Sequence, residues 1–491
     1  MSAKVLPHPA LLKRGFESSG IHPALSAWIA AAVPPDSDVR NGLRQLRARS
    51  RDAAQNDDHM RLFLRMVESN VIGRQGVSVQ PNPHRPSGRE DAAARQMIEA
   101  AYAEQSQRGH WDVTGQHSRA GFARLAVRTI AQDGEALIRI HDTGPTADTP
   151  TGFAVELIDA ECLDLDYNTT LANGNQVRMG VEVSPRRRPV AYHLFTDDPL
   201  PGQGYRTGRE RIRVPVSEIL HVYLPEWVQT SRGVPWAATA LRRLKMLGGY
   251  EEAAITAARA AAVKSAVYVW QEGADPAHRP GTEEDGQLVQ DLSPGGVEIA
   301  PYGYDLKTLD WAWPNTEHGQ FVKDALRGIA AGLCVSYNAL ANDLENVNFS
   351  SLRQGALAER DLWMLLQDWW VDWVERPIYH RWLDYQLRNL LLTQRNGAPF
   401  PDDRRPGLYR VAFQGRRWPW VDPLKDMQAA REAVALGTRS ISDIIRESGR
   451  DPDDVWTELG RDLERLRGLG LNLNDVLAAP PAAAEEPTDD E

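Results

Sequence analysis

Five carboxylates between positions 156 and 166 are the first candidates for chemistry in this sequence: Glu156, Asp159, Glu161, Asp164 and Asp166. Clustered carboxylate oxygens are preferred ligands of divalent cations, and a bound cation could activate water against a phosphodiester. The other interpretation is an acidic edge facing water. The spacing, along a strand at 154–158 and its following loop, does not make the side chains converge. We favour the acidic edge and keep a metal-dependent nucleic-acid enzyme as the alternative.

Histidines and cysteines offer little further chemistry. His110 and His117 flank a loop and could form a metal pair, but isolated histidines are commonly ordinary surface residues. Cys162 and Cys334 are far apart and have no CxxC spacing, which indicates a reducing interior without a disulfide framework. The sequence contains none of the motifs GxxxxGK[ST], GxSxG or HExxH. We predict no metal, no cofactor and no enzymatic activity.

Two other stretches could contact nucleic acid. Tryptophans recur at helical spacing after position 350 and could stack on bases, although such a pattern more often marks a core or a subunit interface. The basic stretch Arg40–Arg51 could bind nucleic acid or an acidic partner, although a helix face in water is the favoured interpretation. Neither stretch by itself predicts a function.

The secondary structure that must position these residues changes at Gly233, from a region rich in predicted strands to a mainly helical region. Before it, a helix with Met60, Leu64, Val67 and Val71 on one face ends at Gly73, and 76–80 predicts a short strand. The region 120–230 predicts a sheet, in which Gln132-Asp133-Gly134 is a hairpin turn. Its expected strands are 123–131, 135–141, 153–158, 181–183, 190–195 and 219–223.

After Gly233 the pattern is mainly helical. Apolar residues at helical spacing predict a helix over 234–264, about 45 Å long at 1.5 Å per residue. Strand and turn composition follows over 265–316, then a helix at 317–333, an Asn-rich break at 336–349 and a long helix that Pro377 should kink. A strand pair is expected at 408–421, with helices at 426–436, 442–448 and 453–467. The acidic segment from Pro480 is expected to be disordered.

Bulk composition restricts the function classes. A chain of 491 residues predicts two to four domains. The net charge of -11 argues against a protein that grips nucleic acid through phosphates, because that requires a surplus of Lys and Arg. No signal peptide and no run of about 18 apolar residues is found, so we expect a soluble, intracellular protein that contacts no membrane.

Several short segments spread along 47–462 form a recognisable series. They are Arg47–Asp52, Val71–Gly73, Val155–Ala160, Gly180–Val183, Arg188–His193, Val214–His221, the Gln229–Trp236 stretch before the long helix, Arg327–Leu340 and Asn346–Arg353. In this order they resemble the lambda-type portal family of tailed phages. The most specific are Val214–His221, Gln229–Trp236 and Arg327–Leu340, where Cys334 occupies a position that is commonly Gly in the family.

The resemblance implies a fold and a domain order. It implies a multi-domain α+β portal fold with long stem and wing helices and small β-sheets, assembling as a ring of about twelve subunits. The implied parts are an N-terminal segment, partly flexible (1–59), wing (60–233), first stem helix (234–264), clip (265–316), second stem helix (317–335), tunnel loop (336–349), wing helix and return strands (350–429), crown (430–479) and a disordered acidic tail (480–491).

The resemblance also implies residue roles and partners. Channel contacts are expected from the tunnel-loop residues Asn338, Asn342, Asp343, Glu345, Asn346 and Asn348. Stem and inter-subunit packing is expected from Leu241, Leu244, Ala258, Ala262, Phe321 and Ala325. The implied partners are other copies of the chain, the large terminase subunit, a head–tail connector or adaptor, major capsid and scaffold proteins, and double-stranded DNA that passes without sequence-specific binding.

The implied location is the portal vertex of the virion capsid, with assembly in the host cytoplasm. There the ring would package and eject DNA. A different head–tail ring component is the remaining alternative, although adaptors are usually far shorter than 491 residues.

Overall fold

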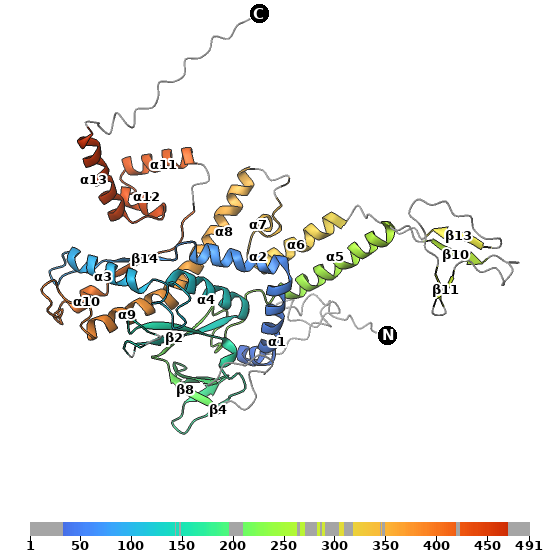
Figure 1. The fold of residues 1–491 in the computed structure, drawn as a ribbon, viewed down its shortest axis with the longest axis horizontal. Coiled ribbons are helices and arrows are strands. Elements are labelled where there is room, and N and C mark those ends of the chain that lie inside the picture. Colours follow the sequence, from blue (N-terminus) through green and yellow to red (C-terminus); the bar gives the residue numbers. More distant parts are fainter. Residues whose placement is uncertain are drawn as a thin grey trace, which may run out of the picture.

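The computed structural model describes residues 33–469, apart from 143, 147–148, 196–209, 263–265, 271–281, 285–286, 290–303, 309–317, 344, 346–348 and 419–422. It has a mixed α+β fold with small antiparallel sheets, from which two helices project as a rod and three others lie beyond strand β14 (Figure 1). Among the described residues, no helix combines the length and the apolar character needed to cross a lipid bilayer.

Helices and one small sheet form one side of the body. The amino-terminal helices are α1 (Pro35–Asn56), α2 (Asp58–Val67), the π-helical turn η4 (Glu68–Ile72), α3 (Ala92–Gln105) and α4 (Arg119–Asp133). Strand β1 (Ser78–Pro81) pairs antiparallel with β14 (Val411–Gln414), more than three hundred residues later in the chain. As predicted, η4 ends at Gly73, whose φ of 79° suits glycine.

Two antiparallel sheets form the other side. The first has the order β3-β2-β9, and the second has the order β4-β5-β6-β7-β8. Their strands are β2 (Glu135–His141), β3 (Ala154–Ile158), β4 (Thr169–Thr170), β5 (Gln176–Arg178), β6 (Val181–Val183), β7 (Pro189–Phe195), β8 (Arg211–Pro215) and β9 (Ile219–Tyr223), with the 3₁₀ turn η5 (Ala160–Cys162) after β3. The predicted strands 135–141, 153–158, 181–183, 190–195 and 219–223 are confirmed within one residue at each end.

The strand predicted at 123–131 is wrong, because this segment belongs to helix α4. The Ser118 side chain caps the helix by accepting a hydrogen bond from the Gly121 N–H. Apolar residues at 122, 123, 126, 127, 130 and 131 form one buried helical stripe. Gly134, at a φ of 91°, ends the helix, so Gln132-Asp133-Gly134 is a helix end and not a hairpin turn.

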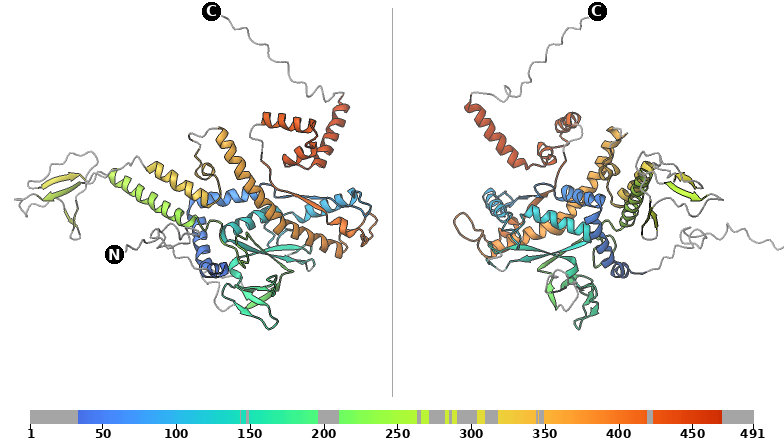
Figure 2. Two further views of the ribbon diagram at one scale, coloured as in Figure 1. Left: turned by 180° about the vertical axis from the view of Figure 1, so that it is seen from behind. Right: turned by 45° about the vertical axis from the view of Figure 1, so that its right-hand side comes forward.

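The rod consists of α5 (Leu241–Ala262) and α6 (His318–Gly332), which lie side by side in all three views (Figures 1 and 2). Helix α5 begins seven residues later than predicted, because turns occupy the residues after Pro235. At the far end of the rod lie the antiparallel pairs β10 (Ala266–Trp270) with β13 (Tyr304–Thr308) and β11 (Thr282–Glu284) with β12 (Gln287–Val289) (Figure 1).

The long tryptophan-rich helix is interrupted. Helix α8 (Phe349–Trp370) passes through a π-helical turn, η6 (Val371–Glu375), into α9 (Arg376–Arg388). Pro377 is the second residue of α9, and the backbone stays helical from η6 into α9, so its missing N–H interrupts the helical hydrogen-bond ladder there. The irregularity of the helix is therefore the π-helical turn before Pro377. The Trp363, Trp370 and Trp382 side chains are buried, which confirms a core role for them and contradicts base stacking.

The remaining helices differ from the predictions in detail. A short helix, α7 (Tyr337–Ala341), lies inside the predicted Asn-rich break. The pair of strands predicted at 408–421 is one strand, β14, preceded by α10 (Arg405–Leu408), and its partner is β1. The last helices, α11 (Pro423–Ala435), α12 (Ile441–Glu447) and α13 (Pro452–Gly468), confirm the three predicted ones within a few residues. The acidic segment from 480 lies outside the described residues.

Candidate functional site

Helices α5 and α6 hold each other along the rod. Near the body, the Arg243 guanidinium donates to the Gly328 carbonyl at 2.8 Å, and the Thr239 hydroxyl donates to the Gly332 carbonyl at 3.0 Å. Further out, the Tyr250 ring stacks on His318, with the ring centroids 5.3 Å apart. These contacts make the two helices one antiparallel unit within a single chain.

The predicted stem residues have different environments. Leu241 and Leu244 are buried in the core of their own chain, so they stabilise the rod itself. Ala258 and Ala325 are half-buried, and Phe321 is 53% exposed while its ring lies 4.5 Å from that of Tyr250. The Ala262 side chain lies outside the described part. The rod therefore keeps apolar surface after its own packing, including Met246 and Ile255, which are more than half exposed.

Helix α6 ends in a Schellman motif centred on Cys334. The Val335 N–H donates to the Ala330 carbonyl at 3.1 Å, and the Cys334 N–H donates to the Ala331 carbonyl at 3.3 Å. Cys334 has a φ of 56°, the left-handed conformation that a Schellman motif requires and that glycine adopts at least cost. The backbone thus has a geometry suited to Gly, and here Cys334 adopts it.

We expect Cys334→Gly to raise the free energy of unfolding by about 1 kcal/mol, since it removes the Cβ that disfavours the left-handed conformation. Cys334→Ala is the matched control. It removes the thiol but keeps the Cβ, so stability should stay close to that of the unmodified chain. Urea unfolding at one protein concentration measures both, and equal stability of the Gly and Ala variants would contradict this reasoning.

The predicted tunnel loop is anchored to α6 by a lysine. The Lys323 ammonium lies 3.1 Å from the Asp343 carboxylate and 3.2 Å from that of Glu345. The Tyr337 hydroxyl donates to Asp343 at 2.8 Å, and this bond, together with those from the Glu345 N–H and Lys323, lowers the pKa of Asp343. Hydrogen bonds to Asp343 and Glu345 raise the pKa of Lys323.

The structure therefore brings part of the predicted channel set together. Asn338 is half-buried on α7, and Asn342, with a φ of 51°, ends that helix. Asp343 and Glu345 converge on Lys323, which offsets part of their negative charge. Asn346 and Asn348 lie outside the described residues. Sequence reasoning missed Lys323, because the pairing depends on how the chain turns through α7.

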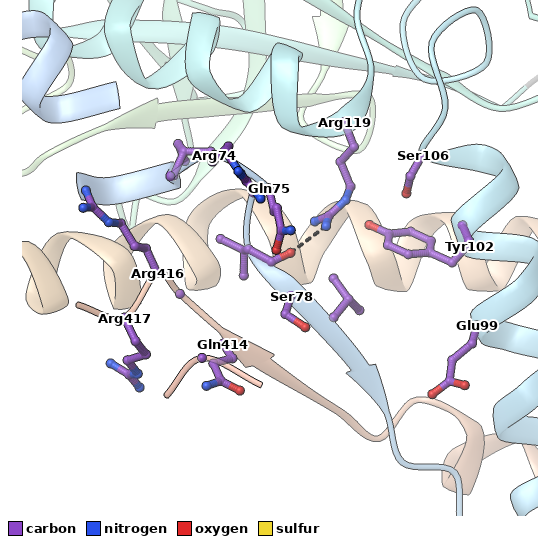
Figure 3. Close-up of a pocket in the computed structure, with 18 of the residues that line it drawn as sticks. Arg74, Gln75, Ser78, Glu99, Tyr102, Ser106, Arg119, Gln414, Arg416 and Arg417 are labelled. Carbon is purple, nitrogen blue, oxygen red and sulfur yellow. Dashed lines mark hydrogen bonds between the residues drawn. The ribbon is translucent and has the colours of Figure 1, made fainter. Parts of the chain in front are cut away.

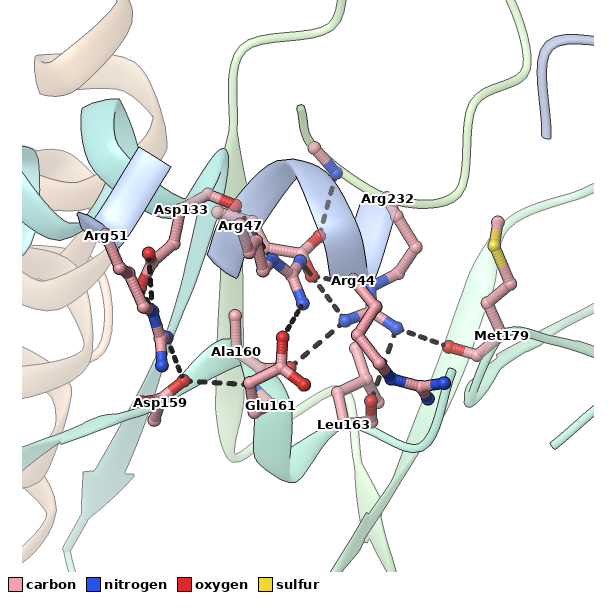
Figure 4. Close-up of polar contacts among 12 residues, drawn as sticks. Arg44, Arg47, Arg51, Asp133, Asp159, Ala160, Glu161, Leu163, Met179 and Arg232 are labelled. Atoms are coloured by element: carbon pink, nitrogen blue, oxygen red, sulfur yellow. Dashed lines mark hydrogen bonds and ion pairs between the residues drawn. The ribbon is translucent and has the colours of Figure 1, made fainter. Parts of the chain in front are cut away.

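The acidic candidates at 156–166 form separate ion pairs, and Figure 4 shows those of Asp159 and Glu161. Three of them contact one face of α1, the basic stretch of the sequence, and Glu156 and Asp164 contact His141 and Arg211. The pairs with α1 are Arg44–Asp166 at 3.3 Å, Arg47–Glu161 at 3.2 Å and Arg51–Asp159 at 2.8 Å. The predicted acidic edge and basic helix face in water hold only in part. Arg44 and Asp166 are both exposed, whereas Arg47 is buried and pairs with Glu161.

Behind these pairs lies a buried charged network around Glu135. Its carboxylate contacts Arg47 and Arg232 at 2.5 Å each and His221 at 2.9 Å, and it accepts a hydrogen bond from the Gly233 N–H at 2.8 Å. Burial alone would raise the pKa of Glu135, but the charges of Arg232 and Arg47 outweigh it and hold the pKa well below its usual range. The network joins α1, β2, β9 and the chain leading to the rod.

The other candidates for metal chemistry are engaged locally. The His117 ring contacts Asp112 at 3.1 Å, and the His110 ring contacts the Glu104 carbonyl at 3.1 Å. Cys162 is buried and Cys334 is exposed, and neither forms a disulfide. Over the described stretches of the chain, no group of three His, Cys, Asp or Glu side chains is arranged to hold a metal ion.

Comparison with known proteins decides between the remaining interpretations. The family described as "Phage portal protein, lambda family" matches residues 22–367, well over half of the chain. The chain belongs to this family. Membership assigns it the role of a phage portal protein, a structural component of the virion without catalytic activity. This confirms the resemblance noted in the sequence and sets aside both the nucleic-acid enzyme and the adaptor.

Relatives of this portal protein cover nearly its whole length. The probable portal protein of Halomonas phage phiHAP-1 is 32% identical over 91% of this chain and 85% of its own. Portal protein B of Escherichia phage lambda is 21% identical over 95% of this chain and 91% of its own. Among solved structures, a chain from the virion of a native gene transfer agent particle aligns with a TM-score of 0.45 and 13% identity, covering 86% of this chain and 97% of its own.

Proposed function

We propose that this portal protein forms a closed ring of about twelve copies, the number implied by the family resemblance, around a channel through which double-stranded DNA is packaged and ejected. The observation that carries the proposal is the α5–α6 rod. It projects from the body as a self-supporting antiparallel pair, and it leaves Met246, Ile255 and Phe321 exposed. Apolar side chains on a projecting rod are best buried by a neighbouring copy.

The arrangement of elements supports the proposed domain order. We assign α5 and α6 to the stem (234–264 and 317–335), the strands at the end of the rod to the clip (265–316), and the end of α11 with α12 and α13 to the crown (430–479). The body would be the wing, formed by 60–233 and 350–429. Helix α1 packs on this body through the buried Arg47, so we place the described part of the segment 1–59 with the wing.

We assign 336–349 as the tunnel loop that contacts passing DNA. A channel lined with unpaired cations would retain DNA, because binding to phosphates releases counterions. Here the one lysine beside the described part of the loop is shared between two carboxylates, so the three side chains together carry a net negative charge. Such a loop can touch DNA without holding it, which fits passage without sequence-specific binding.

We expect Lys323→Gln to loosen this loop. Loss of the ammonium leaves Asp343 and Glu345 to repel each other, so the backbone amides of 337–345 should exchange hydrogen faster than in the unmodified chain. Hydrogen exchange with mass spectrometry measures this. Lys245→Gln, an exposed lysine on α5, is the control and should leave the loop unchanged. Unaltered exchange in the Lys323 variant would show that the ion pairs do not order the loop.

The ring would serve as the docking platform for its partners. We propose that the clip faces the large terminase subunit during packaging and the head–tail connector afterwards, while the wing contacts the major capsid and scaffold proteins. Because the strands β10–β13 lie at the far end of the rod, away from the body, they are placed where an outside partner can reach them.

Mass measurement of the purified chain tests ring formation. The unmodified protein should give particles of about twelve times the 54.7 kDa subunit mass. Phe321→Asp should release single subunits, because it places a charge in the proposed interface. Ile212→Asp, which changes an exposed apolar residue on β8, should keep the ring. Single subunits of the unmodified chain under all conditions would refute the proposal.

A further inference from the structure

A groove of about 690 Å³ lies outside the proposed channel elements, where the body meets the last three helices (Figure 3). One wall is the loop 73–77 with β1, another is α3, and a third is the end of β14 with Ser448 and Gly449 after α12. The groove is large enough for several residues of an extended peptide.

Arginines dominate the charge of this groove. Arg74, Arg119, Arg416 and Arg417 line it, against the single carboxylate of Glu99. Glu99 is engaged by Arg95 at 2.7 Å, and Arg119 is paired with Glu375 at 2.8 Å. In the part of the chain that the structure describes, no carboxylate forms an ion pair with the other three arginines. Although the net charge of the chain is -11, three arginines of this groove thus have no carboxylate partner among the described residues.

The surroundings of Arg416 also carry an excess of positive charge. Its guanidinium donates to two uncharged oxygens of described residues, the Ser69 carbonyl at 2.6 Å and the Asn70 side chain at 2.7 Å. Burial and the nearby charge of Arg360 lower the pKa of Arg416. An anion entering the groove would therefore gain charge-assisted hydrogen bonds to guanidinium groups that have no other anionic partner.

The chain itself contains an anionic segment of suitable charge. Glu485, Glu486, Asp489, Asp490 and Glu491 supply five carboxylates within seven residues. The segment follows α13, and α13 begins at Pro452, three residues after Gly449 of the groove wall. Helix α13 is about 25 Å long, and the fifteen residues 470–484 span up to roughly 50 Å when extended. The acidic segment can therefore return to the groove.

We propose that residues 485–491 dock in the arginine groove of their own chain. Tethering favours this occupant over a separate molecule, because a linker of this length holds the segment at an effective concentration in the millimolar range. A DNA duplex could offer only the phosphates on its outer surface to a groove of this size. By covering Arg74, Arg416 and Arg417, the segment keeps cations that would retain DNA away from its phosphates.

Photocrosslinking in the full-length chain tests the docking. A benzophenone amino acid replaces Thr488, and mass spectrometry locates the crosslinks. We expect them on 74–79 and 414–417. In an Arg74→Gln and Arg417→Gln double variant the yield should fall at least about tenfold, since two charge-assisted contacts are lost. The control is Arg186→Gln with Arg187→Gln, the same charge change in an exposed turn, which should keep the yield.

Crosslinks located elsewhere, an undiminished yield in the double variant or covalent dimers on a denaturing gel would each overturn the proposal. A second experiment uses a photoreactive DNA duplex and a variant in which the five carboxylates are neutralised. Crosslinks from the duplex to the groove that are equally strong with and without this neutralisation would also overturn the proposal. The last result would assign the groove to nucleic acid. Since docking within one chain does not require ring assembly, none of these outcomes bears on the proposed ring.

Discussion

Replacing Glu135 by alanine is expected to lower the free energy of unfolding by about 3–5 kcal/mol, as found when one partner of a buried ion pair is removed. The side chains of Glu135, Arg47 and Arg232 are almost completely shielded from water. Without the carboxylate, two guanidinium groups and the His221 ring remain buried together with no anion between them. Glu161 still pairs with Arg47, at 3.2 Å, whereas Arg232 would keep its hydrogen bonds to backbone carbonyls, such as that of Ala160 at 3.1 Å.

The matched control for this variant is Glu218→Ala. Glu218 also pairs with an arginine, Arg139 at 3.0 Å, but both side chains are about one third exposed. Exposed pairs contribute less than about 1 kcal/mol, so the control should unfold almost like the unmodified chain. Both variants are compared by urea unfolding at one protein concentration, because ring formation links stability to concentration. A loss no larger than that of the control would mean that the network is not held together by Glu135.

Two buried carboxylates, Glu135 and Glu182 on β6, predict how stability depends on pH. The pKa of Glu135 is held well below its usual range, and the hydrogen bond from Arg213 lowers the pKa of Glu182 to about 2. A carboxylate with a depressed pKa stabilises the folded state fully above its unfolded pKa, and this stabilisation is lost as the pH falls. Unfolding free energy should therefore decrease from about pH 4.5 toward pH 2. Glu182→Gln should flatten part of this decrease, and an identical slope in the variant would contradict the assignment.

The second large effect is expected at Trp382, for which alanine should cost about 3–5 kcal/mol. The indole is fully buried, with its ring 4.8 Å from Tyr102 and 5.9 Å from Tyr379. Truncation leaves a cavity between α3 and α9 that rigid neighbours fill poorly. Trp456→Ala on α13 is the control, since its indole is 48% exposed and its removal should change stability by less than about 1 kcal/mol.

This prediction is checked by comparing the thermal unfolding temperatures of Trp382→Ala and Trp456→Ala. If Trp382→Ala unfolded at the same temperature as Trp456→Ala, the tryptophans of this helix would not be core residues. Because Trp382 lies away from the rod, the destabilised variant should still form rings at a temperature where it is folded.

Local sequence patterns predicted most elements but not the charged contacts. Strands such as β2 and β9 and the helices of the rod have strong periodicity. The segment of α4 fits a strand as well as a helix, because Ala123, Leu125 and Val127 alternate with other residues, although the Ser118 cap and the apolar stripe at 122, 123, 126 and 127 favour the helix. Arg47 and Glu135 are 88 residues apart in sequence, and no local pattern links them. The same holds for Lys323 and Asp343.

Cryo-electron microscopy of the assembled full-length chain tests the central claim most directly. The claim predicts a closed ring in which α5 and α6 of every copy stand beside a central hole, with β10 and β13 at one end of it. A reconstruction in which these helices point away from the symmetry axis, or in which neighbouring copies enclose no hole, would contradict it.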